Sequence, residues 1–277
     1  MSLLSSVLLG LIQGIAEFLP ISSSGHLAIA EHLLNMSGAS NIPEFFDVLL
    51  HLGTLIAVFA AYWEDIRDMV LELIDGVRDL ARGSTPNPVR PARRMILLII
   101  VGTLPLFAVL PVKDLVSGLG DNMYFVAGAL LVTGGLLFAS DRVRRGRKTE
   151  RSATLADVLL VGVAQAVATC PGISRSGTTI TAGCFLGFER KFAVRFSFLL
   201  SIPAVLGANI LSLKDAMETV QWSEVPVYLV GVAVAAVTGY FCIRLLRMIA
   251  NNGKFGWFAY YCWAAGLVTL ALTFIQK

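Results

Sequence analysis

The stretch QGIAEFLPISSSGH, residues 13–26, returns in altered form as QAVATCPGISRSGT, residues 165–178. At one constant offset the two copies share the leading Gln, an Ile before the polar run, and a serine-rich turn that ends in Gly. Both copies interrupt an apolar run with Pro, Gly and hydroxyl side chains. A duplicated polar break inside membrane-like sequence is typical of a binding site built between two repeats.

The composition of the chain is that of a membrane protein. Of its 277 residues, 56% are hydrophobic and only 15% are charged, and the mean hydropathy is +0.74. This balance excludes an ordinary soluble domain and predicts an all-α protein that crosses the bilayer several times. The four Cys show no C-x-x-C spacing and are interpreted as packing residues, and the three His form no metal-binding tract.

The apolar stretches are of two kinds. Two broken regions, 3–34 and 155–187, contain the repeated motif in the middle, and each half is too short to cross a bilayer. We expect each region to be a re-entrant helix hairpin that enters and leaves the membrane on one side. Six uninterrupted stretches are long enough for transmembrane helices: 45–62, 94–111, 122–140, 192–211, 225–245 and 256–275.

Basic residues are concentrated in four connecting segments. Segments 64–94 and 141–154 carry six Lys or Arg each, and 188–195 and 244–254 carry three each. The positive-inside rule predicts that these segments face the cytoplasm, which leaves both termini outside.

This topology predicts a single membrane domain, 1–277, made of two inverted repeats. The repeats extend over about 1–141 and 152–277, with the basic loop 141–154 between them. Inverted repeats with broken helices place their site near the midplane, where the breaks meet.

Three smaller patterns have a structural interpretation. Segment 64–94 mixes charges with apolar residues at helical spacing, which predicts an amphipathic helix on the cytoplasmic face followed by a Pro-rich turn. The basic run 142–151 is interpreted as a topology signal, with binding of anionic lipid heads as the alternative. Gly10 and Gly14 are expected to serve close helix packing rather than dimerisation.

Arg175, in the second break, is the strongest candidate functional residue. An Arg inside a membrane hairpin is costly and marks a site with an anionic partner, and its planar fork suits bidentate contact with phosphate. The bland alternative is an ion pair with Glu17 that only joins the hairpins. Glu17 lies one helical turn after Gln13, and its carboxylate could bind a divalent cation or act as a base.

His26 follows the first serine run directly and could be a nucleophile or a proton shuttle. His32 and His51 are not assigned a role. The hydroxyls at the starts of the returning helices could cap those helices or help helix N-termini bind phosphate oxygens, and the glycines allow backbone to approach a ligand. The candidate phosphate-binding residues are Gln13, Ser22, Ser24, Gly25, Gly172, Ser174, Arg175, Ser176, Gly177, Thr178 and Thr179.

An acid, an imidazole and hydroxyls around an intramembrane anion site suggest phosphoryl transfer from a lipid phosphate to water. They would equally suit an anion-coupled transporter or a lipid flippase, because such proteins also use inverted repeats and hairpins.

At these residues the chain resembles the bacterial undecaprenyl-diphosphatase family of the bacitracin-resistance type. Residues 13–17 match an E/Q-x-x-x-E motif that continues into FLPISSSGH, and residues 171–179 match P-G-x-S-R-S-x-x-T. The resemblance covers essentially the full length, including the segment FSFLLSIP, residues 196–203.

The resemblance implies hydrolysis of undecaprenyl diphosphate to undecaprenyl phosphate and inorganic phosphate, which recycles the lipid carrier for cell-wall synthesis and confers bacitracin resistance. It also implies a divalent cation, Mg²⁺ or Ca²⁺, a homodimer in the bacterial inner membrane, and a site open to the outer face. No nucleic-acid partner is expected.

By position in the family motifs, Glu17 is the metal or acid/base residue, and Ser23 or His26 is the nucleophile or its helper. Arg175 holds the phosphates, supported by Ser174, Ser176 and Thr179. Gln13 carries no charge and is at most a weak metal ligand, so a mechanism that needs two carboxylates from this helix is in doubt. Whether Ser23, His26 or a water attacks phosphorus stays open.

Two other phosphatase classes are excluded, one by a missing His and one by the spacing between Cys and Arg. Lipid phosphatases of the type-2 phosphatidic-acid-phosphatase superfamily need a His after the Ser-Arg segment, and no His follows His51. A protein-tyrosine-phosphatase loop needs five residues between Cys and Arg, and only four separate Cys170 from Arg175.

Overall fold

The structure, a computed structural model, describes residues 1–36, 42–82, 90–218, 220–252 and 255–275. Within those ranges the chain is helical apart from short connections and one isolated bridge between Lys148 and Phe188. Six helical stretches are long and apolar enough to cross a membrane, which confirms the predicted all-α, six-span architecture. They are Glu44–Ala61, Pro91–Asp121, Met123–Ser140, Arg190–Lys214, Trp222–Ala250 and Gly256–Ile275.

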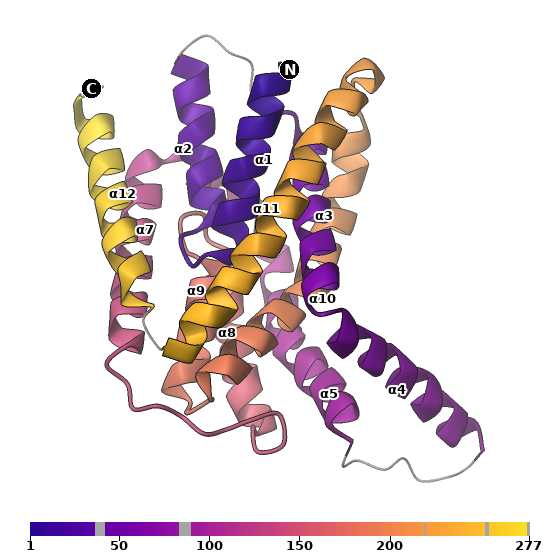
Figure 1. Ribbon diagram of the computed structural model, residues 1–277. Helices are drawn as coiled ribbons and strands as arrows, with labels where there is room; N and C mark the ends of the chain where they lie inside the picture. Colours follow the sequence, from indigo (N-terminus) through magenta and orange to yellow (C-terminus); the bar gives the residue numbers. More distant parts are fainter. Residues whose placement is uncertain (37–41, 83–89, 219, 253–254, 276–277) are drawn as a thin grey trace.

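The two broken regions each form a pair of short helices. The first pair is α1 (Leu3–Phe18) and α2 (Ser23–Met36), and the second is α8 (Leu155–Val167) and α9 (Arg175–Phe185). The helices are shorter than the roughly 20 residues that a single span needs. In Figure 1 the free ends of α1 and α2 both lie at the top, and their connection lies at mid-height. Re-entry into a membrane stays a prediction.

The remaining helices follow the predicted spans with one difference. They are α3 (Glu44–Ala61), α4 (Trp63–Ala81), α5 (Pro91–Thr103), α6 (Lys113–Gly118), α7 (Met123–Ser140), α10 (Arg190–Glu218), α11 (Val225–Asn252) and α12 (Gly256–Ile275). Beyond α5 the predicted span 94–111 continues as the 3-10 turns η1 (Leu104–Ala108) and η2 (Leu110–Val112). Pro105 and Pro111 lack the amide hydrogen that an α-helix needs there, which accounts for the change.

Both ends of the chain lie at the same end of the bundle, and the loops that join α7 to α8 and α11 to α12 lie at the opposite end (Figure 1). The predicted amphipathic helix is α4, whose residues Val70, Leu73, Ile74 and Val77 form an exposed apolar stripe. On its other side, Glu72 is buried and pairs with Arg90 and Arg93 near the start of α5. The expected Pro-rich turn lies outside the described residues.

Helices of the first half pack against helices of the second half in matched pairs. Helix α1 packs on α11, and α8 packs on α5; α3 packs on α10, and α7 packs on α12. In the order of the two halves, α1 is equivalent to α8 and α5 is equivalent to α11, so the first two contacts correspond to each other. The other two contacts each join equivalent helices. This pairing brings the breaks of both hairpins into the middle of the bundle.

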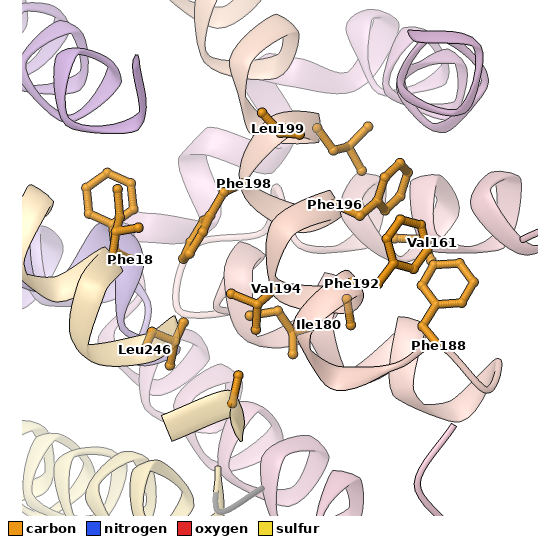
Figure 2. Close-up of a cluster of buried hydrophobic side chains, with 14 of the residues drawn as sticks. Phe18, Val161, Ile180, Phe188, Phe192, Val194, Phe196, Phe198, Leu199 and Leu246 are labelled. Carbon is orange, nitrogen blue, oxygen red and sulfur yellow. The ribbon is translucent and has the colours of Figure 1, made fainter. Parts of the chain in front are cut away.

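An aromatic core on α10 supports both hairpins (Figure 2). Phe198 packs edge-on against Phe18 at the end of α1, with ring centroids 5.6 Å apart. On another side of α10, the rings of Phe192 and Phe196 pack at a tilt beside Phe188, which follows α9. The tip of the first hairpin and the far end of α9 are therefore packed against the same long helix.

Gly10 and Gly14 lie in the contact between α1 and α11, which confirms close packing within one chain. A Cβ at Gly10 would come within 2.4 Å of the Gly231 carbonyl oxygen. A Cβ at Gly14 would come within 2.0 Å of Thr238 Oγ1 and 2.7 Å of the Ala235 carbonyl oxygen.

The variant Gly14→Ala is expected to destabilise the protein by about 1–3 kcal/mol, because the backbone of α11 must move to admit the methyl group. The measurement is the midpoint of thermal unfolding in detergent. Gly128→Ala on α7 is the matched control, because a Cβ at Gly128 meets nothing within 4 Å. Equal midpoints for both variants would contradict the close contact.

Candidate active site

The tips of the two hairpins touch each other at equivalent positions. A Cβ built on Gly25 would lie 3.0 Å from the Cα of Gly172, and one built on Gly177 would lie 3.2 Å from the Cβ of Pro20. The two contacts are equivalent to each other, because Gly25 corresponds to Gly177 and Pro20 corresponds to Gly172 in the repeated motifs. The amide of Gly172 also donates to Ser24 Oγ at 3.4 Å. The predicted meeting of the two breaks is therefore present in the structure.

Glu17 is the centre of the site and gathers residues from both motifs. Its Oε1 pairs with Nη2 of Arg175. Its Oε2 accepts from Ser23 Oγ at 2.7 Å and from Gln13 Nε2 at 3.2 Å. Ser23 and Arg175 occupy the same position in the two repeats, so one carboxylate binds both copies of that position.

The ion pair between Glu17 and Arg175 is largely buried but keeps some contact with solvent. Glu17 is 8% exposed, and the side chain of Arg175 is 19% exposed. Removal of one partner of a buried ion pair leaves an uncompensated charge, so each group depends on the other. The predicted ion pair is thus present, and Arg175 still has donors beyond Nη2 for a second anion.

The returning helices α2 and α9 begin in the same way. Ser22 Oγ accepts from the Gly25 amide at 3.2 Å, and Ser174 Oγ accepts from the Gly177 amide at 3.1 Å. These bonds are N-caps, the structural role that the sequence offered for these hydroxyls beside phosphate binding. The two turns are not identical, because Ser22 has φ +74° whereas Ser174 has φ −71°.

Several predicted phosphate-binding hydroxyls lie behind the tip of the second hairpin. Ser174, Ser176 and Thr179 are each at most 2% exposed. Thr179 Oγ1 lies 2.6 Å from Ser197 Oγ and donates to the Arg175 carbonyl at 2.9 Å. Thr178 Oγ1 is buried. In this arrangement these residues support the start of α9, and direct contact with a phosphate stays a prediction.

His26 lies on the first hairpin but faces α12. Its Nδ1 is 2.8 Å from the Ser22 carbonyl oxygen, and its Nε2 is 2.7 Å from the hydroxyl of Tyr261. Tyr261 was not found by sequence reasoning, and nothing in its surroundings in the sequence marks it out. Ser23, by contrast, bonds directly to Glu17.

A cavity of about 540 Å³ is lined mainly by residues of α2 and of the start of α3, and it includes Ser24 and Pro171, one from each motif. The free end of α2 lies at the end of the bundle where both termini lie (Figure 1). The two histidines to which the sequence assigned no role, His32 and His51, also line the cavity. Its other ionisable groups are the carboxylates of Glu31, Glu44, Asp47 and Asp121.

The residues present suit a divalent cation that is shared with a substrate rather than caged by protein. Among the described residues no group of three or more His, Cys, Asp and Glu side chains could hold a metal. Gln13 Oε1, however, is buried without a hydrogen-bond partner beside Glu17. A carboxylate and an amide oxygen are hard ligands, and Mg²⁺ commonly completes its shell with water and substrate phosphates.

A family model described as "Bacitracin resistance protein BacA" matches residues 6–268. The chain belongs to this family. Among its relatives, an undecaprenyl-diphosphatase of Methanosphaera stadtmanae is 39% identical over 281 residues, covering 99% of each chain. Those of Syntrophotalea carbinolica and Alkaliphilus metalliredigens are 41% and 37% identical, covering 99% of this chain and 100% of the relative.

The match spans both hairpins and the six candidate spans, so the fold and the site described above are those of one BacA-family protein. Membership of this family confirms the resemblance inferred from the two motifs.

Proposed function

We propose that the chain hydrolyses undecaprenyl diphosphate to undecaprenyl phosphate and inorganic phosphate, recycling the lipid carrier and conferring resistance to bacitracin. The observation that carries the proposal is the convergence of Ser23, Arg175 and Gln13 on the carboxylate of Glu17. A hydroxyl bonded to a carboxylate is an activated nucleophile, and an adjacent guanidinium is a phosphate clamp. The names of the relatives support the same substrate.

Ser23 is the group that attacks the terminal phosphorus in this proposal. Ser23 Oγ forms the new P–O bond and passes its proton to Glu17 Oε2, 2.7 Å away. The bond from that phosphorus to the bridging oxygen breaks, and undecaprenyl phosphate leaves. Arg175 binds the terminal phosphate oxygens, over which the charge of the transferred group is spread in the transition state.

A water then releases the phosphate from Ser23. His26 lies three residues after Ser23 in α2, so the two side chains project from the same face of that helix. The water forms a bond to phosphorus and gives its proton to His26 Nε2, while the P–O bond to Ser23 breaks. Ser23 Oγ recovers its proton from Glu17, and His26 Nε2 releases the proton taken from water to solvent, which returns the site to its first state.

A divalent cation, Mg²⁺ or Ca²⁺, would be held by Glu17 with Gln13 Oε1 and would neutralise charge on the diphosphate. The cation would bind Glu17, and the diphosphate would bind the cation and Arg175, so the binding of cation and lipid is expected to be cooperative.

The site is proposed to open to the outer face of the cell membrane, with both termini outside and the protein a homodimer. Both chain ends and the free end of α2 lie at one end of the bundle, and the basic segment 141–154 lies at the other (Figure 1). The cavity is lined by α2 and the start of α3. This arrangement supports the orientation that the positive-inside rule predicts.

The direct test is phosphate release from undecaprenyl diphosphate by the purified protein in detergent. Release is expected with Mg²⁺ or Ca²⁺, to fall to background with EDTA, and to return when the metal is restored. Arg175→Ala is measured beside it. Folded wild-type protein that binds the lipid but releases no phosphate would contradict the proposal and favour a transporter or flippase.

A further inference from the structure

The imidazole of His26 is held from two sides by residues far apart in the sequence. The carbonyl of Ser22 lies 2.8 Å from Nδ1, and the hydroxyl of Tyr261 on α12 lies 2.7 Å from Nε2. The two rings are also stacked, with centroids 5.6 Å apart and an angle of 13° between their planes. The ring therefore has one fixed position and one fixed orientation.

These two contacts determine which nitrogen of His26 carries the hydrogen. A carbonyl oxygen can only accept, so Nδ1 must be the N–H that donates to Ser22. In the neutral ring Nε2 then has the lone pair, and the hydroxyl of Tyr261 must donate to it.

The Ser22 carbonyl is itself fixed. It also accepts from the backbone amide of His26 at 3.2 Å. Among the residues that the structure describes, Ser22 is the only non-glycine residue with positive φ, at +74°. A left-handed serine is rare and costs energy, so the conformation of this residue is held by its surroundings.

We propose that Tyr261 is a positioning residue for His26. This role rests on the proposed function, in which Nε2 of His26 takes a proton from the attacking water. The hydroxyl of Tyr261 holds the ring in the tautomer that leaves Nε2 able to accept, and it keeps Nε2 oriented until the water replaces it. Tyr261 itself makes no bond to the substrate and gives up no proton in the reaction.

Tyr260 provides a matched control on the same helix. It is 56% exposed, against 46% for Tyr261. Its ring packs edge-on against Phe138 and Trp263 on the other side of α12. The variant Tyr260→Phe therefore removes the same phenol oxygen from the neighbouring residue and leaves the contacts of the first hairpin unchanged.

The kinetic test compares Tyr261→Phe with Tyr260→Phe. Tyr261→Phe is expected to lower kcat by about 10- to 100-fold with little change in KM, the size of effect usual when a hydrogen bond that orients a reactive imidazole is removed. Tyr260→Phe is expected to match the wild type. The double variant His26→Ala/Tyr261→Phe should be no slower than His26→Ala alone, because Tyr261 acts only through His26. Additive losses in the double variant would overturn the inference.

A second readout does not depend on turnover. Nitrogen NMR of protein labelled with ¹⁵N-histidine reports the tautomer of each of the three histidines, and His26→Ala assigns the signal. The wild type should show His26 with hydrogen on Nδ1, and Tyr261→Phe should show a larger fraction with hydrogen on Nε2. If the wild type releases phosphate but carries the His26 hydrogen on Nε2, the role of Tyr261 is overturned and the proposed function stands. If the wild type releases no phosphate, the proposed function is overturned.

Discussion

Replacement of Arg175 with Lys is expected to lower phosphate release by about 10²–10³-fold per folded molecule, the usual cost of losing one preorganised donor to transition-state charge. In the structure the guanidinium binds Glu17 through Nη2, and the rest of its fork remains for the phosphate oxygens. A lysine brings one compact charge that cannot hold a carboxylate and a phosphate in the same fixed geometry. The measurement is kcat/KM for undecaprenyl diphosphate, with the folded fraction determined by thermal unfolding.

Arg190→Lys is the control for the loss of a buried arginine pair. Arg190 is 9% exposed and donates to Asp141 at 2.9 Å, and it follows the end of α9 whereas the site lies at the start of that helix. We expect this variant to unfold at a lower temperature while each folded molecule keeps its turnover. Near-normal turnover of Arg175→Lys would remove Arg175 from the central role and leave only the ion pair that joins the hairpins.

Ser23→Ala is expected to lower turnover by at least about 10³-fold, because it removes the atom that attacks phosphorus. Binding of the lipid diphosphate should change little, since Arg175 and the two helix N-termini remain. Single-turnover release of phosphate, measured beside equilibrium binding of the lipid, separates the two effects.

The matched control is Ser6→Ala in the same hairpin. Ser6 is fully buried, and its Oγ donates to the Val227 carbonyl at 2.7 Å. Its loss should lower stability and leave turnover per folded molecule unchanged. If Ser23→Ala kept a tenth or more of the wild-type turnover, a water or His26 would be the attacking group instead.

The sequence carried enough information to predict the fold class and the meeting of the two broken regions. Pro20 and the serine run stop one helix and start another, so the break at the first motif follows from local chemistry. The constant offset between the motifs also places Ser23 and Arg175 at equivalent positions. The six spans follow from apolar length, and only the end of α5 differed, where Pro105 and Pro111 change the hydrogen bonding.

The partners of the site residues could not be predicted, because they depend on packing between distant segments. Tyr261 meets His26 only because α12 packs on α7 beside the first hairpin. His51 lines the cavity because α3 packs beside α1, and no motif precedes or follows it. The hydroxyls of Ser174 and Thr179 have phosphate-binding chemistry by type, yet the structure uses them inside the helix start.

The stereochemical course at phosphorus tests most directly whether Ser23, Glu17 and Arg175 act as one covalent catalytic unit. The substrate is undecaprenyl diphosphate whose terminal group is a phosphorothioate made chiral with oxygen isotopes, hydrolysed in isotopically labelled water. Transfer to Ser23 and then to water is two displacements, so the released thiophosphate should retain its configuration. Inversion would mean that water attacks the lipid diphosphate directly and would contradict the account.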